Sequence, residues 1–175
     1  MAALAADELT ARARKVRVLA FDVDGVCTDG RLYYGPTGEM LHAFHARDGL
    51  GLVLARTAGI TLCAVSGRDS FHVSARMREL RVPHILQGIQ HKKDALDRVL
   101  AGVGATFDEL AYIGDDVNDL SVLTCAGLSA CVADAADDVF AQVHYVTRRR
   151  GGEGALRELI ELVLKAQEKW TWPVP

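Results

Sequence analysis

Two carboxylates and a glycine follow an apolar segment near the start of the chain. Residues 18–21 read Val-Leu-Ala-Phe, and Asp22, Asp24 and Gly25 come next, with only a valine between the two acids. An apolar run of this length predicts a buried parallel strand, and in open α/β sheets ligands bind beyond the carboxyl ends of such strands. Asp and Gly are also ordinary turn residues, so an acidic turn without chemistry is the alternative at this point.

A hydroxyl residue and a lysine follow two later apolar segments. Ser66-Gly67-Arg68 comes directly after the apolar segment 60–65. A strand-to-helix turn of this kind offers main-chain N–H groups and a hydroxyl to an anion, although Ser66 could also be a simple helix N-cap. Lys92 and Lys93 open a later predicted helix, where positive charge opposes the helix dipole. We interpret Lys93 as a surface residue and Lys92 as a functional one.

Three carboxylates and an amide crowd one turn further along the chain. Segment 110–113 is apolar, and Asp115, Asp116, Asn118 and Asp119 follow it. One of these acids could cap a helix, but the mutual repulsion of all three is unfavourable without a cation. The sequence therefore predicts a divalent cation at the edge of the sheet where these strands end.

A phosphoryl-transfer reaction accounts for all of these groups together. Mg²⁺ binds a few carboxylates plus phosphate oxygens, and Asp22, Asp24 and Asp115 are its predicted ligands. Asp22 is the predicted nucleophile and forms an aspartyl-phosphate. Asp24 is the predicted general acid, which protonates the leaving oxygen and then deprotonates the attacking water. Ser66 and Lys92 would hold the phosphoryl oxygens.

Strands and helices alternate along the chain, which predicts an α/β fold with a doubly wound, mainly parallel sheet. The predicted strands are 16–22, 60–65, 82–88, 110–113, 128–132 and 144–146. Five predicted helices are 2–14, 70–80, 91–102, 135–141 and 155–170. Another is capped by residues 45–49 and runs to about residue 58, and one more begins in the acidic turn after residue 114 and runs to residue 126. A β-hairpin, with strands at 31–34 and 39–44 around a Gly35–Gly38 turn, follows the first acids.

The composition is that of an ordinary protein domain and argues against several functions. The chain has 175 residues, half of them hydrophobic, and a formal net charge of −3, which gives no general attraction to nucleic acid. The basic run 148–150 lacks the interleaved aromatic residues of a nucleic-acid site. Four scattered cysteines without a CxxC pair indicate reduced thiols rather than zinc ligands. With neither a run of membrane-spanning length nor a signal peptide, we expect a cytoplasmic protein without a membrane partner.

The order and spacing of the motifs resemble those of the haloacid dehalogenase superfamily. Asp22-x-Asp24-Gly25, Ser66-Gly67-Arg68, Lys92 and Gly114-Asp115-Asp116-x-x-Asp119 are similar to its four motifs and cover nearly the whole chain. Aspartate two residues after the nucleophile resembles the phosphatases, whereas the transport ATPases have threonine there. The resemblance implies hydrolysis of a phosphate ester rather than a stored phosphoenzyme.

Further segments resemble one family within it, the 3-deoxy-D-manno-octulosonate (KDO) 8-phosphate phosphatases. The similar segments are 21–26, 44–51, 87–88, 114–116 and 151–158. The resemblance implies hydrolysis of KDO 8-phosphate to KDO and phosphate in lipopolysaccharide biosynthesis. It also implies a homotetramer, in which a neighbour's hairpin and its tail, here 148–158, cover the site.

The same resemblance implies a domain organisation without a cap domain. Residues 1–175 would form a single phosphatase domain, with its core at 15–150, a hairpin flap at 28–46 and a C-terminal helix and tail at 151–175.

The family resemblance also implies a set of residues that contact the substrate. These residues are Asp24, His45, Ala46, Arg47, Asp48, Gly49, Arg68, Arg76, Lys92 and Asn118. Val53 departs from the family pattern, since many members have a basic residue there. The contact to the sugar-acid carboxylate would then be missing or come from Arg47.

Three other functions agree with parts of the pattern. Similar phosphatases act on nine-carbon ulosonate 9-phosphates, but the segment Arg47-Asp48-Gly49 resembles the eight-carbon family more closely. A non-catalytic tetramerisation module, like the domain fused to some sialic-acid activating enzymes, would not need intact Asp22, Asp24, Lys92 and Asp115. A two-component receiver also combines acids, Mg²⁺ and a lysine, but its phosphorylated aspartate lies on a middle strand.

Overall fold

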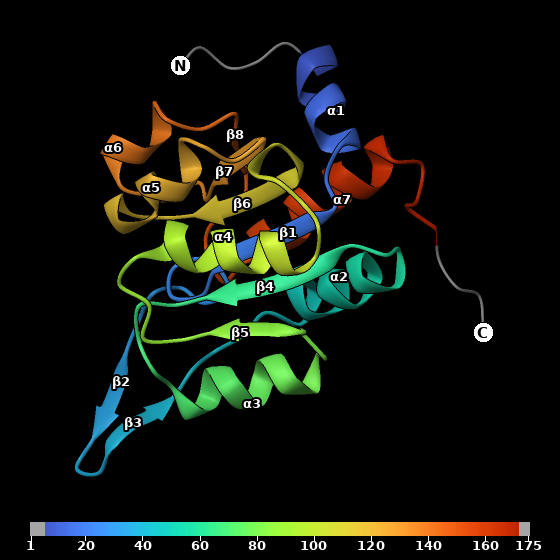
Figure 1. Cartoon of the computed structure of the whole chain (residues 1–175). Helices are drawn as coiled ribbons and strands as arrows, with labels where there is room; N and C mark the ends of the chain where they lie inside the picture. Colours follow the sequence, from blue (N-terminus) through green and yellow to red (C-terminus); the bar gives the residue numbers. More distant parts are fainter. Residues whose placement is uncertain (1–5, 172–175) are drawn as a thin grey trace.

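A six-stranded parallel sheet forms the centre of the computed structural model, which describes residues 6–171 (Figure 1). The strands lie in the order β5-β4-β1-β6-β7-β8, and each neighbouring pair is parallel. Their bounds are β1 (Val18–Asp22), β4 (Thr61–Val65), β5 (His84–Leu86), β6 (Leu110–Gly114), β7 (Leu128–Cys131) and β8 (Tyr145–Val146). The predicted fold class is confirmed.

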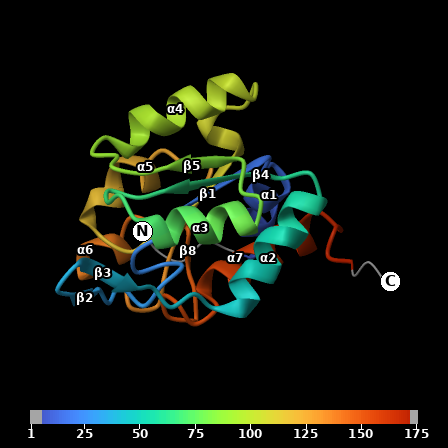
Figure 2. The same cartoon turned by 90° about the horizontal axis from the view of Figure 1, so that it is seen from below.

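Helices cover both faces of this sheet (Figure 2). Helices α4 and α5 contact each other on one face, and α2 packs against α7 on the other. The helices are α1 (Ala6–Arg14), α2 (Ala46–Thr57), α3 (Phe71–Glu79), α4 (Lys92–Gly102), α5 (Leu120–Leu123), α6 (Asp137–Phe140) and α7 (Ala155–Ala166), with 3-10 turns η1 (Phe107–Glu109) and η2 (Val117–Asp119). Within residues 6–171, no helix has the length and apolar character needed to cross a membrane.

The two central strands are buried along their whole length. Every residue of β1 and of β6 is buried, because helices cover both faces of the sheet at its centre. A side chain that must reach solvent or a ligand therefore has to lie at a strand end. The carboxyl ends of the strands share one edge, on the left in Figure 1, and the chain turns from strand to helix or hairpin there.

A hairpin projects from this same edge of the sheet (Figure 1). Strands β2 (Tyr33–Gly35) and β3 (Gly38–Leu41) pair antiparallel, and the turn between them is the two residues 36–37. The hairpin strands are therefore shorter than predicted, and the turn lies between Gly35 and Gly38 as predicted. Gly38 has a φ of +111°, which lets β3 begin directly after this tight turn.

Some helix ends also differ from the prediction. The last helix ends at Ala166 instead of about residue 170, because Glu168 has a left-handed φ of +58° and the main-chain N–H of Lys169 donates back to the carbonyl of Leu164. The helix predicted after the acidic turn is divided into η2 and α5 and ends at Leu123. Residues 2–5 of the first predicted helix lie outside the described residues, and the rest of it forms α1.

Candidate active site

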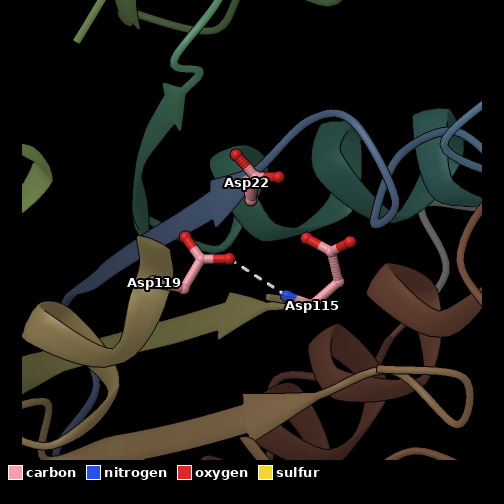
Figure 3. A group of neighbouring side chains, drawn as sticks. All are labelled: Asp22, Asp115 and Asp119. Carbon is pink, nitrogen blue, oxygen red and sulfur yellow. Dashed lines mark hydrogen bonds between the residues drawn. The ribbon is translucent and has the colours of Figure 1, made fainter. Parts of the chain in front are cut away.

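Three carboxylates meet where β1 and β6 end (Figure 3). Asp22 is the last residue of β1, Asp115 follows β6, and Asp119 ends the turn η2. One oxygen of each carboxylate lies within 4.8 Å of the other two. Asp22 and Asp119 are almost completely buried, so water screens the repulsion among the three acids poorly.

Two glycines make room for these acids. A Cβ atom at Gly25 would lie 2.0 Å from Asp115 Oδ2, and this residue also has a φ of +90°, which other residues rarely adopt. A Cβ atom at Gly114 would lie 2.4 Å from Asp119 Oδ2. Glycine is thus required at position 25 by the close packing of Asp115 and at position 114 by the close packing of Asp119.

Lys92, the first residue of α4, joins two of the acids. Its Nζ donates to Asp22 Oδ1 at 2.6 Å and to Asp119 Oδ1 at 2.7 Å. Burial disfavours the ammonium, but the two carboxylates outweigh this effect and raise the pKa of Lys92, which keeps it charged. The neighbouring Lys93 is exposed, as expected for a surface residue.

Asp119 accepts more hydrogen bonds than the other two acids. Its Oδ1 accepts from Lys92 and from the buried Tyr112 hydroxyl, which lies at 2.5 Å, and its Oδ2 accepts from the main-chain N–H of Asp115 at 3.0 Å. Asp119 therefore serves to orient Lys92 and the turn that carries Asp115. The motif spacing contains Asp119 but does not separate its role from that of its neighbours, and nothing in the sequence pattern points to Tyr112.

The donor set fits Mg²⁺, which prefers hard oxygen ligands. Because the oxygens of Asp119 are already engaged, Asp22 and Asp115 are the side chains left to hold a cation. The side chain of Asp24 lies elsewhere: its Oδ2 accepts from Ser66 Oγ at 3.2 Å and its Oδ1 accepts from Arg68 Nη1 at 3.2 Å. The carboxylate of Asp24 thus faces Ser66 and Arg68, and the predicted metal ligation by Asp24 stays a prediction.

Burial and mutual repulsion hold protons on the acid cluster when no cation is bound. Burial, followed by the charge of Asp119, raises the pKa of Asp22 to about 6 against the opposing effect of Lys92. Burial, followed by the charges of Asp22 and Asp119, raises the pKa of Asp115 to about 8. In the unfolded chain both carboxyls titrate near pH 4. These groups therefore favour the folded state at low pH, and this contribution is lost as the pH rises through about 6 and then about 8.

We expect Mg²⁺ to stabilise the protein more at pH 8 than at pH 6. A cation must displace the proton that Asp115 holds at pH 6, so the apparent affinity for Mg²⁺ falls by roughly tenfold per pH unit below the pKa of this group. Thermal melts at several Mg²⁺ concentrations and at both pH values measure this effect. In Asp115→Asn the difference in Mg²⁺ stabilisation between pH 6 and pH 8 should largely disappear. An increase in melting temperature that is equal at both pH values in the unaltered protein would contradict the expectation.

A second group of predicted residues lies in and around the first turn of α2. Asp48 is buried, and its Oδ1 accepts from the main-chain N–H of Arg157 in the first turn of α7 at 2.7 Å. A Cβ atom at Gly49 would lie 2.4 Å from Arg76 Nη2, so Arg76 packs directly on this glycine. His45 is next to Gly154 and precedes α2. The structure thus gives Asp48 and Gly49 packing roles that hold α2, α3 and α7 together.

The remaining predicted residues are at the surface or in the packing of α2. Ala46, Arg47 and Asn118 are exposed. Within residues 6–171, the side chains of Arg47 and Asn118 make no hydrogen bond or ion pair, which leaves them available to a ligand. Val53 is partly buried and packs against the core.

The segment 148–158 folds against its own chain. The main-chain N–H of Gly152 donates to the carbonyl of Val26, and a Cβ atom at Gly151 would lie 1.7 Å from the carbonyl oxygen of Gly25. The absence of a side chain at Gly151 thus lets the segment pack on the first motif of the same chain. The expectation that the segment also covers a neighbouring active site stays a prediction. Residues 172–175 of the predicted tail lie outside the described residues.

Comparison with known proteins agrees with this arrangement. Residues 84–159 match the family model described as haloacid dehalogenase-like hydrolase. A parallel sheet with acids at the ends of β1 and β6, bridged by a lysine from α4, together with this match defines a hydrolase of the haloacid dehalogenase class.

More specific similarity comes from individual proteins. The chain is 42% identical to 3-deoxy-D-manno-octulosonate 8-phosphate phosphatase KdsC of Yersinia pestis, over 94% of this chain and 88% of the relative. It is 40% identical to KdsC of Escherichia coli K12, over 93% of this chain and 86% of the relative. The chain belongs to the 3-deoxy-D-manno-octulosonate 8-phosphate phosphatase family.

Two solved structures extend this similarity to the fold. The crystal structure of the Yersinia pestis phosphatase matches with a TM-score of 0.92 and 41% identity, over 94% of this chain and 89% of that one. The phosphatase of Moraxella catarrhalis, in complex with magnesium ion, phosphate ion and KDO, matches with a TM-score of 0.92 and 37% identity, over 95% of both chains.

Proposed function

We propose that this protein is a Mg²⁺-dependent phosphatase that hydrolyses KDO 8-phosphate to KDO and phosphate. The observation that carries the chemistry is the buried Lys92 ammonium, which bridges Asp22 and Asp119 beside Asp115. A carboxylate nucleophile, a fixed cation and a free pair of metal-binding acids are what phosphoryl transfer needs. The substrate is proposed from the family, since the relatives are named for this activity and the Moraxella complex contains KDO.

The first half of the proposed reaction transfers the phosphoryl group to the enzyme. Asp22 Oδ attacks phosphorus, the bond between phosphorus and the sugar oxygen breaks, and Asp24 gives a proton to that oxygen. Lys92 and the Ser66 hydroxyl hold phosphoryl oxygens in place. Asp22 and Asp115, with Asp24 as the third predicted ligand, would hold Mg²⁺, which when bound neutralises the charge on the transferred group.

The second half releases phosphate. Asp24, now deprotonated, accepts a proton from a water molecule, and the resulting hydroxide attacks phosphorus of the aspartyl-phosphate. The bond between phosphorus and Asp22 breaks, which restores the carboxylate. Arg68 and Ser66 keep the Asp24 carboxylate at the position from which it serves both steps.

Phosphate release from a series of sugar phosphates tests this function. With Mg²⁺ present, we expect kcat/KM to be highest for KDO 8-phosphate and clearly lower for a nine-carbon ulosonate 9-phosphate. The Arg47-Asp48-Gly49 segment supports this preference, because it resembles the eight-carbon family more closely. The exposed Arg47 side chain is free to meet the carboxylate, which both substrates have. Preference for the nine-carbon ester would overturn the substrate. Absence of release from every ester would instead favour the non-catalytic tetramerisation module.

The same proposal includes assembly into a homotetramer through the hairpin. Five large apolar side chains on or beside β2 and β3 are exposed, an unusual concentration for a free surface, and a second copy of the chain would cover them. They are Leu32, Tyr33, Tyr34, Met40 and Leu41. Light scattering should then give a mass near four chains of 18.9 kDa, and a fully active monomer would contradict this part.

We also propose that the chain acts as a single catalytic domain in the cytoplasm, within lipopolysaccharide biosynthesis. The family supports this setting, since the relatives are named for the hydrolysis of KDO 8-phosphate.

A further inference from the structure

The hairpin is connected to the active site through one acidic residue. Glu39 lies on β3, and its Oε1 accepts from Arg68 Nη2 at 2.6 Å. Its Oε2 accepts a short hydrogen bond from the hydroxyl of Ser70, the N-cap of α3. Burial alone would raise the pKa of Glu39, but these hydrogen bonds outweigh it and lower the pKa, so the carboxylate is charged at neutral pH. A charged, mostly buried acid is thus fixed from both oxygens.

Arg68 carries this contact to the proposed general acid. Its guanidinium donates to Asp24 Oδ1 from Nη1, and to both Glu39 Oε1 and the Tyr34 hydroxyl from Nη2. The guanidinium is planar and its donors are in fixed relative positions, so the place of one partner determines where the other must lie. Glu39 therefore helps to decide where Arg68 meets Asp24.

Asp24 has a second basic neighbour, His42, whose Nε2 lies 3.8 Å from Asp24 Oδ1 and 3.1 Å from Glu39 Oε1. Asp24 Oδ1 is beyond hydrogen-bond distance of His42, so Arg68 is the basic side chain that donates to Asp24. The second oxygen of Asp24 accepts from Ser66 Oγ, and that hydroxyl also accepts from the main-chain N–H of Arg68. The side chain of Asp24 is still 22% exposed, so burial does not fix its rotamer. Its orientation depends on Ser66 on one side and on Arg68 on the other.

We propose that Glu39 is a positioning residue for catalysis, which acts through Arg68 to hold Asp24 where it can protonate the leaving oxygen. The inference rests on the proposed function, because it needs Asp24 as the general acid. Without the Glu39 carboxylate, Arg68 keeps an ion pair on one side only and gains rotamer freedom. Asp24 then spends less time in the productive orientation, and proton transfer to the leaving group slows.

Comparing two leaving groups separates this role from a purely structural one. An alkyl phosphate such as KDO 8-phosphate needs a proton on its leaving oxygen, whereas p-nitrophenyl phosphate releases a stable phenolate without one. In Glu39→Gln we expect kcat/KM to fall by about 10–100-fold for KDO 8-phosphate and by less than about twofold for the aryl ester, as general acid catalysis supplies roughly 10²–10⁴-fold. The ratio kcat/KM is used because it reports on the first phosphoryl transfer.

A matched variant controls for the substitution itself. Glu109 pairs with Arg17 at 3.1 Å just before β6, at the edge of the sheet opposite the active site. Glu109→Gln should leave kcat/KM unchanged for both KDO 8-phosphate and p-nitrophenyl phosphate. An equal loss for both esters in Glu39→Gln, or no loss for either, would overturn the proposal.

Variants of Arg68 and Asp24 test the same inference, and the single variants do so even if Glu39→Gln folds poorly. Arg68→Lys retains the charge but cannot contact Asp24 and Glu39 together, and it should show the same selective loss. The double variant should lose no more than Arg68→Lys alone, and additive losses would overturn the proposal. Asp24→Asn should show the largest difference between the two esters. If it shows none, the general acid assignment fails, which is distinguishable from a failure of Glu39 alone.

Discussion

Replacing Asp22 with asparagine is expected to lower phosphate release on the order of 10⁴-fold or more, because it removes the nucleophile and with it the covalent step. The amide has nearly the same shape as the carboxylate and can still accept from Lys92 through its oxygen. It cannot, however, form an aspartyl-phosphate. Phosphate release with saturating Mg²⁺ and substrate measures the effect.

The fold should survive this change. Asp22 is repelled by Asp119 and by Asp115, and Lys92 retains its contact with Asp119 in the variant. We therefore expect the metal-free variant to melt within a few degrees of the unaltered protein at pH 8. The exposed Asp97→Asn on α4 is the matched control and should keep full activity. Turnover at a normal rate in Asp22→Asn would exclude Asp22 as the nucleophile.

The sequence predicted the sheet and the gathering of its strand ends because those features depend on local pattern. Buried parallel strands are continuous apolar runs, and the carboxyl ends of such strands share one edge. Asp22, Ser66 and Asp115 each follow such a run, so their proximity could be inferred without knowing any side-chain position. Lys92 could be inferred as well, because a lysine at a helix start is unfavourable unless it has a partner.

The roles of individual side chains could not be predicted in the same way. The carboxylate of Asp24 faces Ser66 and Arg68 instead of the acid cluster. These two partners lie more than 40 positions from Asp24 in the sequence, so the local pattern around Asp24 does not reveal them. Asp48 belongs to a segment that resembles a substrate site, but it is buried and caps α7. A motif indicates that a residue matters, whereas only the packing of distant segments separates a ligand contact from a structural one. Glu39 lies outside every motif, so its contact with Arg68 had no signal at all.

Replacing Lys92 with methionine is expected to damage both activity and stability. The side chain is buried with Asp22 and Asp119, and its removal leaves two buried acids without their cation, at a cost of about 3–5 kcal/mol near pH 8. The rate of phosphate release should fall by roughly 10²–10³-fold, as for the loss of other fixed charges at a transition state. Denaturant titrations and phosphate release at pH 8 measure the two effects.

Two conditions should restore much of the lost stability of Lys92→Met, and each follows from the same electrostatics. Lowering the pH toward 6 protonates Asp22, whose pKa rises further without the ammonium, so the difference from the unaltered protein should shrink. Adding Mg²⁺ supplies positive charge to the same carboxylates, so it should stabilise the variant more than the unaltered protein. Neither condition restores activity, because the phosphoryl oxygens still lack their fixed cation. Lys93→Met, one residue further on and exposed, is the control, and similar behaviour of the two variants would contradict the role of Lys92.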